Sequence, residues 1–306
     1  MELICEIDNI ANPLVASAVT VGNFDGVHLG HKALIEKTIL KAHDIGGKSI
    51  AITFNPHPLK ILAPQKCPLL ITTNERKAEL IAQTGVDALI SVRFTPEFAS
   101  IPAESFIKDI LCAKLGMKAI IVGPDYTFGA NREGSIETLN KIKKSTGLEV
   151  TVLPWVGNAR ERISSTRIRN LILDGKVAEA NRLLGRHYEL TGVVVSGRNR
   201  GARLLGFPTA NLSISNELCP KAGVYAALAQ HCGKTYKAVA NIGYSPTFAD
   251  GALTIEAHLL DFADSLYGEM IRIDIVKRLR GEKKFPSHKE LAVQIRKDIM
   301  TAREAL

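Results

Sequence analysis

The feature that most constrains the fold is a change in hydrophobic pattern near Gly185, in a chain of 306 residues. Before this point, short apolar runs alternate with amphipathic stretches, in one of which Ile35, Ile39 and Ala42 recur at helical spacing. The apolar runs are SAVTVG, KSIAITF, DALISVRF, KAIIVG and LEVTVLPWV. Strands that alternate with helices form parallel sheets with helices on both faces, so we expect ligands beyond the carboxyl ends of these strands.

After Gly185 the pattern changes to strand-like runs with little helix between them: ELTGVVVSG, GVYAALAQ, KTYKAVANIG, LTIEAHLLDF and MIRIDIVKRLR. Short strands with glycine-containing connections predict a small antiparallel β-barrel. The last segment is helical and opens with Ser287 and Glu290 at capping-box spacing. A chain of this length favours two domains, which we place at residues 1–185 and 186–306.

Charge and cysteine content narrow the class of partner. The chain has 39 basic and 31 acidic residues, a net charge of +8, which suits anionic partners such as nucleotides. No basic block is interleaved with aromatic residues and no apolar run spans a bilayer, so neither nucleic acid nor a membrane is expected. Five widely spaced cysteines without a C-x-x-C pair predict a cytoplasmic protein. Self-association stays open.

The stretch VGNFDGVHLGH, residues 21–31, predicts a turn from a strand into a helix. Helix N-termini bind anions, and glycines let a phosphate approach the backbone closely. His28 and His31 would share one side of the first helical turn and could stabilise charge that develops in a phosphoryl-type transfer. A tight turn without chemistry and a metal site are the alternatives, although no third metal ligand lies at a convincing spacing.

A second stretch, ISSTRIRNLI, strengthens the phosphate interpretation. Hydroxyl side chains stand at a predicted helix start and arginines follow them, which is typical of a phosphate-binding segment. By itself this pattern also fits a capped, solvated basic helix. The residues concerned are Ser164, Ser165, Thr166, Arg167 and Arg169.

Two motifs of the second half point to phosphate and magnesium. SGRNRGARLLGFPTANL begins with a loop of glycines and arginines that could hold a polyphosphate, although a surface loop has the same composition. In FPTAN, Thr209 and Asn211 are two residues apart in an extended segment, so their oxygen atoms could face one Mg²⁺ ion. The alternative is a turn in which both side chains bond only to the backbone.

The run LTIEAHLLDF supplies a candidate base. Strand alternation places Glu256 and His258 on one face. A carboxylate at the mouth of a barrel could accept the proton of a hydroxyl that attacks ATP. A solvated glutamate on a polar sheet face is the alternative, and we expect His258 to be structural.

The first-half motifs, H-x-G-H followed by SSTRIR, resemble those of the nucleotidylyltransferase superfamily, whose domain is Rossmann-like. The longer stretches GNFDGVHLGHKALI, TFNPHPLKIL and VGPDYTFGANREG resemble its branch of bacterial bifunctional riboflavin kinase/FAD synthetases. The resemblance assigns ATP-phosphate contacts to His28 and His31. It assigns further nucleotide contacts to Gly22, Phe24, Asp25, Gly26, Gly30, Ser164, Ser165, Thr166 and Arg167. It assigns flavin contacts to Asn55, His57, Asp125 and Phe128, and Tyr126-Thr127 stands where the family more often has Phe-Arg.

The second-half motifs GFPTANL, GVYAA, NIGYSPTF, EAHLLDF, LYG and LRGEKKF resemble the riboflavin kinase domain of the same family, in the same order. The resemblance implies that Thr209 and Asn211 bind magnesium and that Glu256 is the general base. It places the nucleotide of the kinase at Gly197, Arg203, Gly206, Phe207 and Pro208.

The resemblance implies an enzyme of flavin-cofactor biosynthesis with Mg²⁺ as cofactor and ATP, riboflavin and FMN as small-molecule substrates. The barrel would phosphorylate riboflavin to FMN, and the α/β domain would join AMP from ATP to FMN with release of pyrophosphate. An adenylyltransferase for a pantetheine or nicotinate phosphate is an alternative, but it leaves GFPTAN and Glu256 unused. A flavin- or RNA-binding regulator on this scaffold predicts eroded motifs, whereas His28 and Thr209 are both present.

Overall fold

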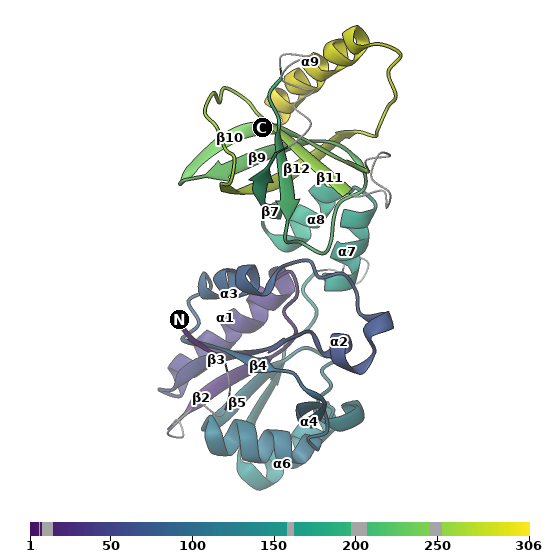
Figure 1. Ribbon diagram of the computed structural model, residues 1–306. Helices are drawn as coiled ribbons and strands as arrows, with labels where there is room; N and C mark the ends of the chain where they lie inside the picture. The colour runs from purple at the N-terminus through teal and green to yellow at the C-terminus, as the bar shows by residue number, and fades with distance from the viewer. Residues whose placement is uncertain (6, 8–14, 158–161, 197–206, 245–252) are drawn as a thin grey trace. The chain divides into compact units, whose positions relative to one another are not determined.

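The computed structural model describes residues 1–5, 7, 15–157, 162–196, 207–244 and 253–306 (Figure 1). It contains two compact units, Met1–Ser164 and Ser165–Leu306. The two units are described in turn.

The first unit contains a six-stranded sheet in the order β1-β4-β3-β2-β5-β6, with every pair of neighbours parallel. The sequence predicts five of these strands and the parallel sheet, and the structure confirms them. It does not reveal β1, because this strand has three residues and no apolar face of its own. The strands are β1 (Glu2–Ile4), β2 (Ser17–Val21), β3 (Lys48–Asn55), β4 (Ala88–Arg93), β5 (Met117–Val122) and β6 (Glu149–Val152).

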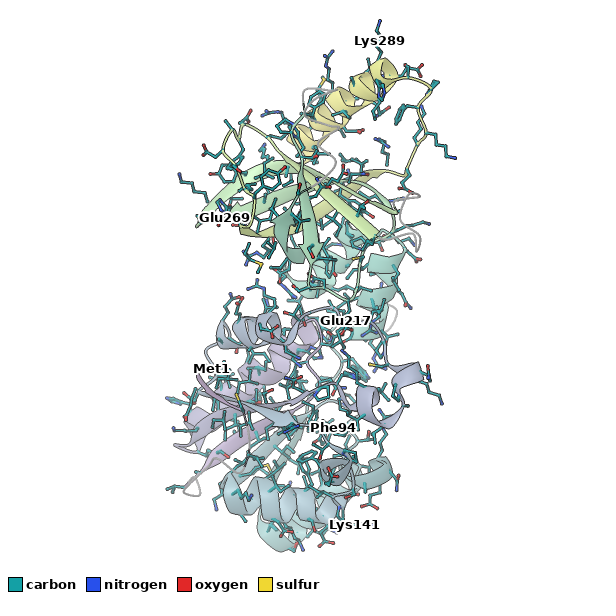
Figure 2. The ribbon with its side chains drawn as sticks, viewed as in Figure 1. Met1, Phe94, Lys141, Glu217, Glu269 and Lys289 are labelled. Atoms are coloured by element: carbon teal, nitrogen blue, oxygen red, sulfur yellow. The ribbon has the colours of Figure 1, made fainter. Side chains whose placement is uncertain are left out.

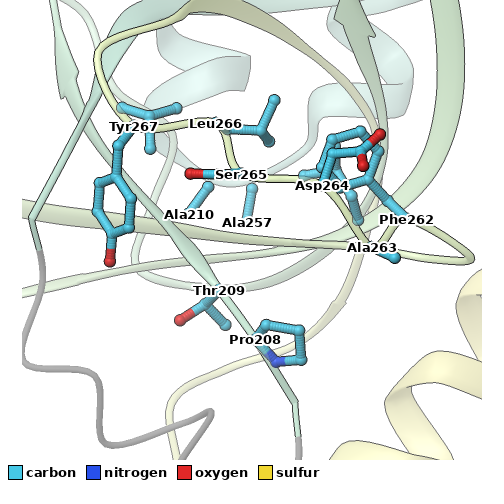
Figure 3. A pocket seen from close by; sticks show the side chains of 12 residues that line it. Pro208, Thr209, Ala210, Ala257, Phe262, Ala263, Asp264, Ser265, Leu266 and Tyr267 are labelled. Atoms are coloured by element: carbon cyan, nitrogen blue, oxygen red, sulfur yellow. The ribbon is translucent and has the colours of Figure 1, made fainter.

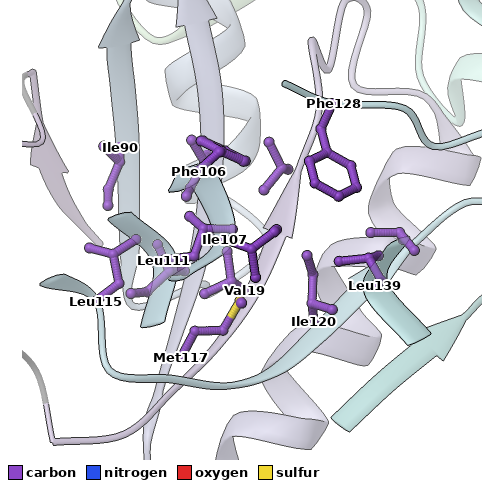
Figure 4. Close-up of a cluster of buried hydrophobic side chains, with 14 of the residues drawn as sticks. Val19, Ile90, Phe106, Ile107, Leu111, Leu115, Met117, Ile120, Phe128 and Leu139 are labelled. Carbon is purple, nitrogen blue, oxygen red and sulfur yellow. The ribbon is translucent and has the colours of Figure 1, made fainter. Parts of the chain in front are cut away.

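Helices cover both faces of this sheet, as the alternating pattern predicts. On one face, odd-numbered β2 residues such as Val19 pack with Phe106 and Leu139 from two helices, η3 (Phe106–Lys114) and α6 (Ile136–Thr146) (Figure 4). On the other face, Ile35 and Leu80 from α1 (Leu29–Asp44) and α3 (Asn74–Ala82) pack against Ala51. The shorter helices of this unit are α2 (Pro58–Leu62), η2 (Pro64–Lys66), α4 (Pro96–Ala99), α5 (Ala103–Ser105) and η4 (Ala130–Arg132).

The strand order locates the binding edge of the sheet. From β2 the chain moves to β3 and β4 on one side, and then returns to β5 and β6 on the other side. The order therefore reverses beside β2, and in open parallel sheets ligands bind beyond the carboxyl ends of the strands at such a point. Residues 22–31 follow the carboxyl end of β2 directly.

The second unit begins with two helices and continues as a closed antiparallel barrel in the order β10-β11-β8-β7-β12-β9. The barrel confirms the prediction for the second half. From the sequence, β8 is predicted only as an extended segment, because the strand has five residues and a weak alternation of apolar and polar side chains. The elements are α7 (Ser165–Leu173), α8 (Val177–Leu184), β7 (Tyr188–Val195), β8 (Ala210–Ile214), β9 (Gly223–His231), β10 (Lys234–Tyr244), β11 (Leu253–Leu259), β12 (Met270–Arg280) and α9 (His288–Ala305).

Helix α8 joins the barrel through one side chain. The Asn181 amide donates to the carbonyl oxygen of Ile275 at 2.9 Å and accepts the backbone N–H of Tyr188 at 2.7 Å. In the structure, therefore, α8 packs with the second unit. The boundary between residues 185 and 186, as a division between two catalytic domains, stays a prediction.

The C-terminal helix α9 has the predicted cap. The Ser287 hydroxyl accepts the backbone N–H of Glu290 at 3.3 Å. Arg280, at the end of β12, holds the helix through bonds of 2.8 to 3.1 Å to both carboxylate oxygens of the buried Asp298. All five cysteines carry free thiols. In the described part of the chain, no helix combines the length and the apolar character that a membrane crossing requires.

Candidate functional sites

The turn after β2 has a strained backbone. Phe24, Gly26 and Val27 have φ angles of 48°, 84° and 39°. Positive φ is uncommon in residues other than glycine and is costly for a β-branched residue such as Val27. The packing of Phe24 and Val27, which are 1% and 0% exposed, holds the turn in place. The sequence therefore uses apolar burial to keep a tight turn at the binding edge.

His28 and His31 lie together at the start of α1. His28 is the N-cap residue, because its Nδ1 accepts the backbone N–H of His31 at 3.2 Å. The two imidazole rings stack with centroids 3.5 Å apart and an interplanar angle of 18°. Since Nδ1 of His28 is an acceptor, the neutral ring carries its proton on Nε2, which is then a donor. A Cβ on Gly30 would lie 3.1 Å from the His28 ring, which explains the glycine between the histidines.

The Asp25 carboxylate binds the chain itself. Its Oδ1 accepts the backbone N–H groups of Ile71 at 2.9 Å and Thr72 at 3.2 Å, and the side chain is 6% exposed. The backbone N–H of Gly26 in turn donates to the Thr72 hydroxyl at 3.2 Å. These bonds join the turn to the segment before α3. The structure thus gives Asp25 a supporting position in the site, and its predicted contact with a nucleotide stays a prediction.

Sequence reasoning missed Lys77, which lies below the same turn. This residue of α3 is 8% exposed, and its Nζ donates to the carbonyl oxygens of Asn23 at 3.3 Å and Phe54 at 3.5 Å. Burial lowers the pKa of the Lys77 ammonium to about 8, against the opposing effect of Asp25. No motif marks this lysine, because its position in NERKAEL is typical of a charged surface helix.

Asn55 and His57, which the resemblance assigns to the flavin, follow the carboxyl end of β3. The side-chain Oδ1 of Asn55 accepts the side-chain amide N–H of Asn74 at 2.8 Å. His57 is the N-cap of α2, where its Nδ1 accepts the backbone N–H of Leu59 at 3.2 Å. Both residues therefore lie at the binding edge of the sheet with ordered side chains.

Asp125 and Phe128 have different surroundings. Asp125 is exposed and forms an ion pair at 3.1 Å with Arg162, whose guanidinium lies 3.0 Å from the centroid of the Trp155 ring. Phe128 is 6% exposed and stacks on Tyr126 with centroids 5.2 Å apart. These two rings end a row of aromatic contacts that continues through Phe106 and Phe98 to Phe94. Figure 2 labels Phe94 among the side chains of the first unit.

Tyr126, which replaces a more frequent phenylalanine, adds a polar group to this row. Its hydroxyl is buried and has no hydrogen-bond partner in the described part of the chain. Burial raises the pKa of the Tyr126 phenol far above its ordinary value. Tyr126 thus keeps the ring stack on Phe128, but its buried hydroxyl without a partner in the described residues lowers the stability of the fold.

The predicted phosphate segment lies where the two units meet in the sequence. Ser164 is the last residue of the first unit, and Ser165, Thr166 and Arg167 form the first turn of α7 in the second. The helix start is confirmed. The contact of these residues with the nucleotide of the first unit stays a prediction.

Two oxygen-bearing side chains share one face of the barrel wall, and a third lies two residues from one of them in the chain. In the ladder between β8 and β11, Asn211 lies opposite Glu256, and Thr209 is two residues before Asn211. Residues directly opposite in an antiparallel pair have Cβ atoms about 5 Å apart on the same face. None of the three side chains has a hydrogen-bond or ion-pair partner within the residues that the structure describes. Burial raises the pKa of the Glu256 carboxyl.

A cavity of about 500 Å³ lies beside Thr209 (Figure 3). The loop from Phe262 to Tyr267 covers one side of it, and the small side chains of Ala210 and Ala257 lie between this loop and Thr209. The lining is mixed and combines apolar side chains such as Leu259, Phe262 and Leu266 with the polar groups of Thr209, Asp264, Ser265 and Tyr267. Such a space fits the base of a nucleotide better than its phosphates.

Phe207 and Pro208, the last predicted nucleotide residues of the kinase, contact His258. The His258 Nδ1 lies 2.7 Å from the Pro208 carbonyl oxygen, and its ring meets Phe207 edge-on with centroids 5.7 Å apart. Gly197, Arg203 and Gly206 lie outside the described residues.

The comparisons with known proteins agree with this two-site arrangement. Residues 12–167 match the family model described as FAD synthetase, and residues 184–306 match the one described as riboflavin kinase. Both halves of the chain are therefore transferase domains of flavin metabolism.

Full-length relatives carry the same two domains. A bifunctional riboflavin kinase/FMN adenylyltransferase of Escherichia coli strain K12 is 39% identical over 306 residues, which cover 99% of this chain and 97% of that protein. Its counterpart from Listeria monocytogenes is 39% identical over 287 residues, with 93% and 90% covered. The chain belongs to the family of bifunctional riboflavin kinase/FMN adenylyltransferases.

A solved structure shows the same fold. The crystal structure of a protein from Streptococcus pneumoniae, described as a macrolide-efflux protein, superposes with a TM-score of 0.89 at 33% identity. The superposition covers 98% of each chain. The likeness thus extends over both units.

Proposed function

We propose that the barrel of this chain converts riboflavin to FMN with ATP, and that the α/β unit then converts FMN to FAD with a second ATP. The observation that carries the proposal is the pair Asn211 and Glu256 on one barrel face, with Thr209 two residues before Asn211, all three without a partner among the described residues. The same chain places two stacked histidines at the binding edge of a parallel sheet. The first set suits a metal and a base, and the second suits a phosphate.

In the kinase step, Glu256 accepts the proton of the 5′-hydroxyl of riboflavin while the hydroxyl oxygen attacks the γ-phosphorus of ATP. The bond between this phosphorus and the bridging oxygen breaks, and ADP leaves. Because burial raises the pKa of Glu256, its carboxylate is a better base than an exposed glutamate. General-base assistance of this kind accelerates reactions by roughly 10²- to 10⁴-fold.

The donor set near Glu256 fits magnesium. Mg²⁺ prefers oxygen ligands and takes few of them from the protein, the rest of its shell being phosphate and water. Thr209 Oγ1 and Asn211 Oδ1 would hold the ion, since neither group is engaged elsewhere in the described part of the chain. When bound, the ion neutralises charge on the ATP phosphates. The cavity beside Thr209 would take the adenine ring.

In the adenylyltransferase step, a phosphate oxygen of FMN attacks the α-phosphorus of ATP, and pyrophosphate leaves. His28 stabilises the charge that develops, by donating from Nε2 while Nδ1 caps α1. His31, stacked on His28, holds the neighbouring phosphate. No adenylyl-enzyme forms, because positioning and electrostatics suffice for such a transfer.

Other residues would support this second step. We expect the backbone of Gly22, Phe24, Gly26 and Gly30 to approach the nucleotide, and Ser164 to Arg167 to bind its phosphates. Asn55 and His57 would face the flavin, with Asp125 and Phe128 nearby. A cytoplasmic location and self-association stay predictions.

The experiment that tests the proposal is a time course. The purified protein is incubated with riboflavin, ATP and magnesium, and the flavins are separated by chromatography. We expect FMN first and FAD after it. If FMN forms but FAD does not, and FAD also fails to form from directly supplied FMN, the adenylyltransferase activity is contradicted. If no new flavin forms, the alternatives to test are another adenylyl acceptor and a binding protein.

A further inference from the structure

The His258 side chain hydrogen-bonds to the backbone of Pro208, just beyond the last residue pair of the ladder between β8 and β11. The register between β8 and β11 pairs Leu212 with Ile255, Asn211 with Glu256 and Ala210 with Ala257. Continuing this register places Thr209 opposite His258. Pro208, one residue further, has no backbone N–H and cannot extend the ladder. The side chain of His258 takes over there and holds the Pro208 carbonyl oxygen at 2.7 Å.

The same ring holds the residue on the other side of Pro208. Its edge-on contact with Phe207, at 5.7 Å between centroids, adds an aromatic contact to the hydrogen bond. One side chain on β11 thus contacts both Phe207 and Pro208, the two residues directly before Thr209. Because the acceptor is a carbonyl oxygen, His258 must carry a proton on Nδ1.

We infer that His258 is a positioning residue of the kinase site, which holds Phe207 and Pro208 so that the Thr209 hydroxyl faces the magnesium ion together with Asn211. The inference rests on the proposed function. The exposure of Pro208 distinguishes this positioning role from a role in folding. Pro208 is exposed, so water can replace His258 at its carbonyl oxygen and the fold loses little stability. What is lost is the fixed direction of Thr209.

The test compares two changes at one position. His258→Phe keeps an aromatic ring against Phe207 but removes the Nδ1 donor. His258→Asn removes the ring but retains a donor, because the asparagine amide nitrogen takes nearly the position of the imidazole Nδ1. His231→Phe makes the same change in a half-buried histidine at the C-terminal end of β9, whose ring contacts Cys232 and Glu269 instead.

The direct measurement is calorimetric titration of the full-length protein with Mg·ADP. We expect His258→Phe to raise the dissociation constant at the kinase site roughly fivefold, which corresponds to the net contribution of one hydrogen bond. His258→Asn should recover most of this loss, and His231→Phe should bind like the wild type. Any heat from nucleotide bound by the first unit serves as an internal reference, because all the substitutions lie in the barrel.

Kinetics give the second readout. His258→Phe should raise the KM of the kinase for Mg·ATP, with the KM for riboflavin and the formation of FAD from supplied FMN unchanged. The inference is overturned if His258→Phe binds Mg·ADP like the wild type, or if His258→Asn is as impaired as His258→Phe while both remain folded. If His258→Phe does not fold, His258→Leu replaces it. Failure of the wild type to bind Mg·ADP or to form FMN would overturn the proposed function instead.

Discussion

In the turn after β2, polar side chains are engaged with the protein itself, whereas on the barrel face the corresponding side chains have no partner in the described residues. Asp25 binds the backbone of Ile71 and Thr72, and His28 caps α1. Asn211 and Glu256 face each other without a bond. The first site therefore presents a prearranged backbone to its ligand, while the second presents side-chain oxygens that a metal and a hydroxyl can use.

This difference predicts that substitutions in the barrel affect chemistry with little effect on folding. For Glu256→Gln we expect the rate of FMN formation to fall roughly 10²- to 10⁴-fold, since the base is lost. Formation of FAD from supplied FMN should be unchanged. Both rates are measured by flavin chromatography on the same preparation, which makes the first unit the control for correct folding. Loss of both activities in a folded Glu256→Gln protein would contradict two separate sites.

The same variant gives a pH prediction. A carboxyl whose pKa is raised in the folded state stabilises the protein below its unfolded pKa, and this contribution is lost as the pH rises through the folded pKa. Wild type should therefore lose stability relative to Glu256→Gln as the pH rises above 4.5, the ordinary pKa of a glutamate side chain. Urea unfolding of both proteins between pH 4 and pH 8 checks this, and parallel curves would argue against the burial of Glu256.

At the turn after β2, His28 caps helix α1 and is also proposed to stabilise charge during adenylyl transfer. Two substitutions of His28 separate these roles. His28→Ala should lower FAD formation by roughly 10²-fold or more and should cost about 1 kcal/mol through the lost cap. His28→Asn should restore the stability, because asparagine is a good N-cap, but not the activity. FMN formation should be unchanged in both. Recovery of FAD formation in His28→Asn would mean that the imidazole ring is not needed.

Lys77 tests how strongly the turn depends on buried charge. Its folded pKa of about 8 lies below the ordinary lysine pKa of 10.5, so between these values the unfolded chain binds more protons than the folded one. The free energy of unfolding should thus rise with pH in this window, relative to Lys77→Met, by at most on the order of 3 kcal/mol. Urea unfolding of both proteins at about pH 7.5 and pH 10 measures the difference. An equal pH dependence would show that Lys77 is not buried in solution.

The smallest effect is expected at Asp25. Asparagine retains an oxygen for the N–H groups of Ile71 and Thr72, so Asp25→Asn should lower the stability by about 1 kcal/mol and FAD formation by less than tenfold. Thermal unfolding and initial rates measure the two effects. A loss of activity as large as that of His28→Ala would show that the carboxylate contacts the nucleotide or its metal directly.

The sequence was sufficient to predict the parallel sheet and the barrel, because both have strong periodic patterns. It did not reveal β1 and treated β8 only as an extended segment; both are short and lack such a pattern. Motifs located His28 and Glu256, since these residues stand in fixed order within long recognisable stretches. Lys77 and the bond between His258 and Pro208 join segments far apart in the chain. Contacts of this kind depend on the folded register, and local spacing does not encode them.

The strand order of the first unit also bears on how this protein avoids aggregation. The central strands β2 and β3 are apolar and largely buried, and would readily pair with strands of other molecules if they were exposed. They are paired on both sides, and the outer positions are occupied by β1 and β6, which have three and four residues. The closed barrel has no outer strand at all. In the part of the chain that the structure describes, strand addition therefore meets two edges, β1 and β6, and both are short.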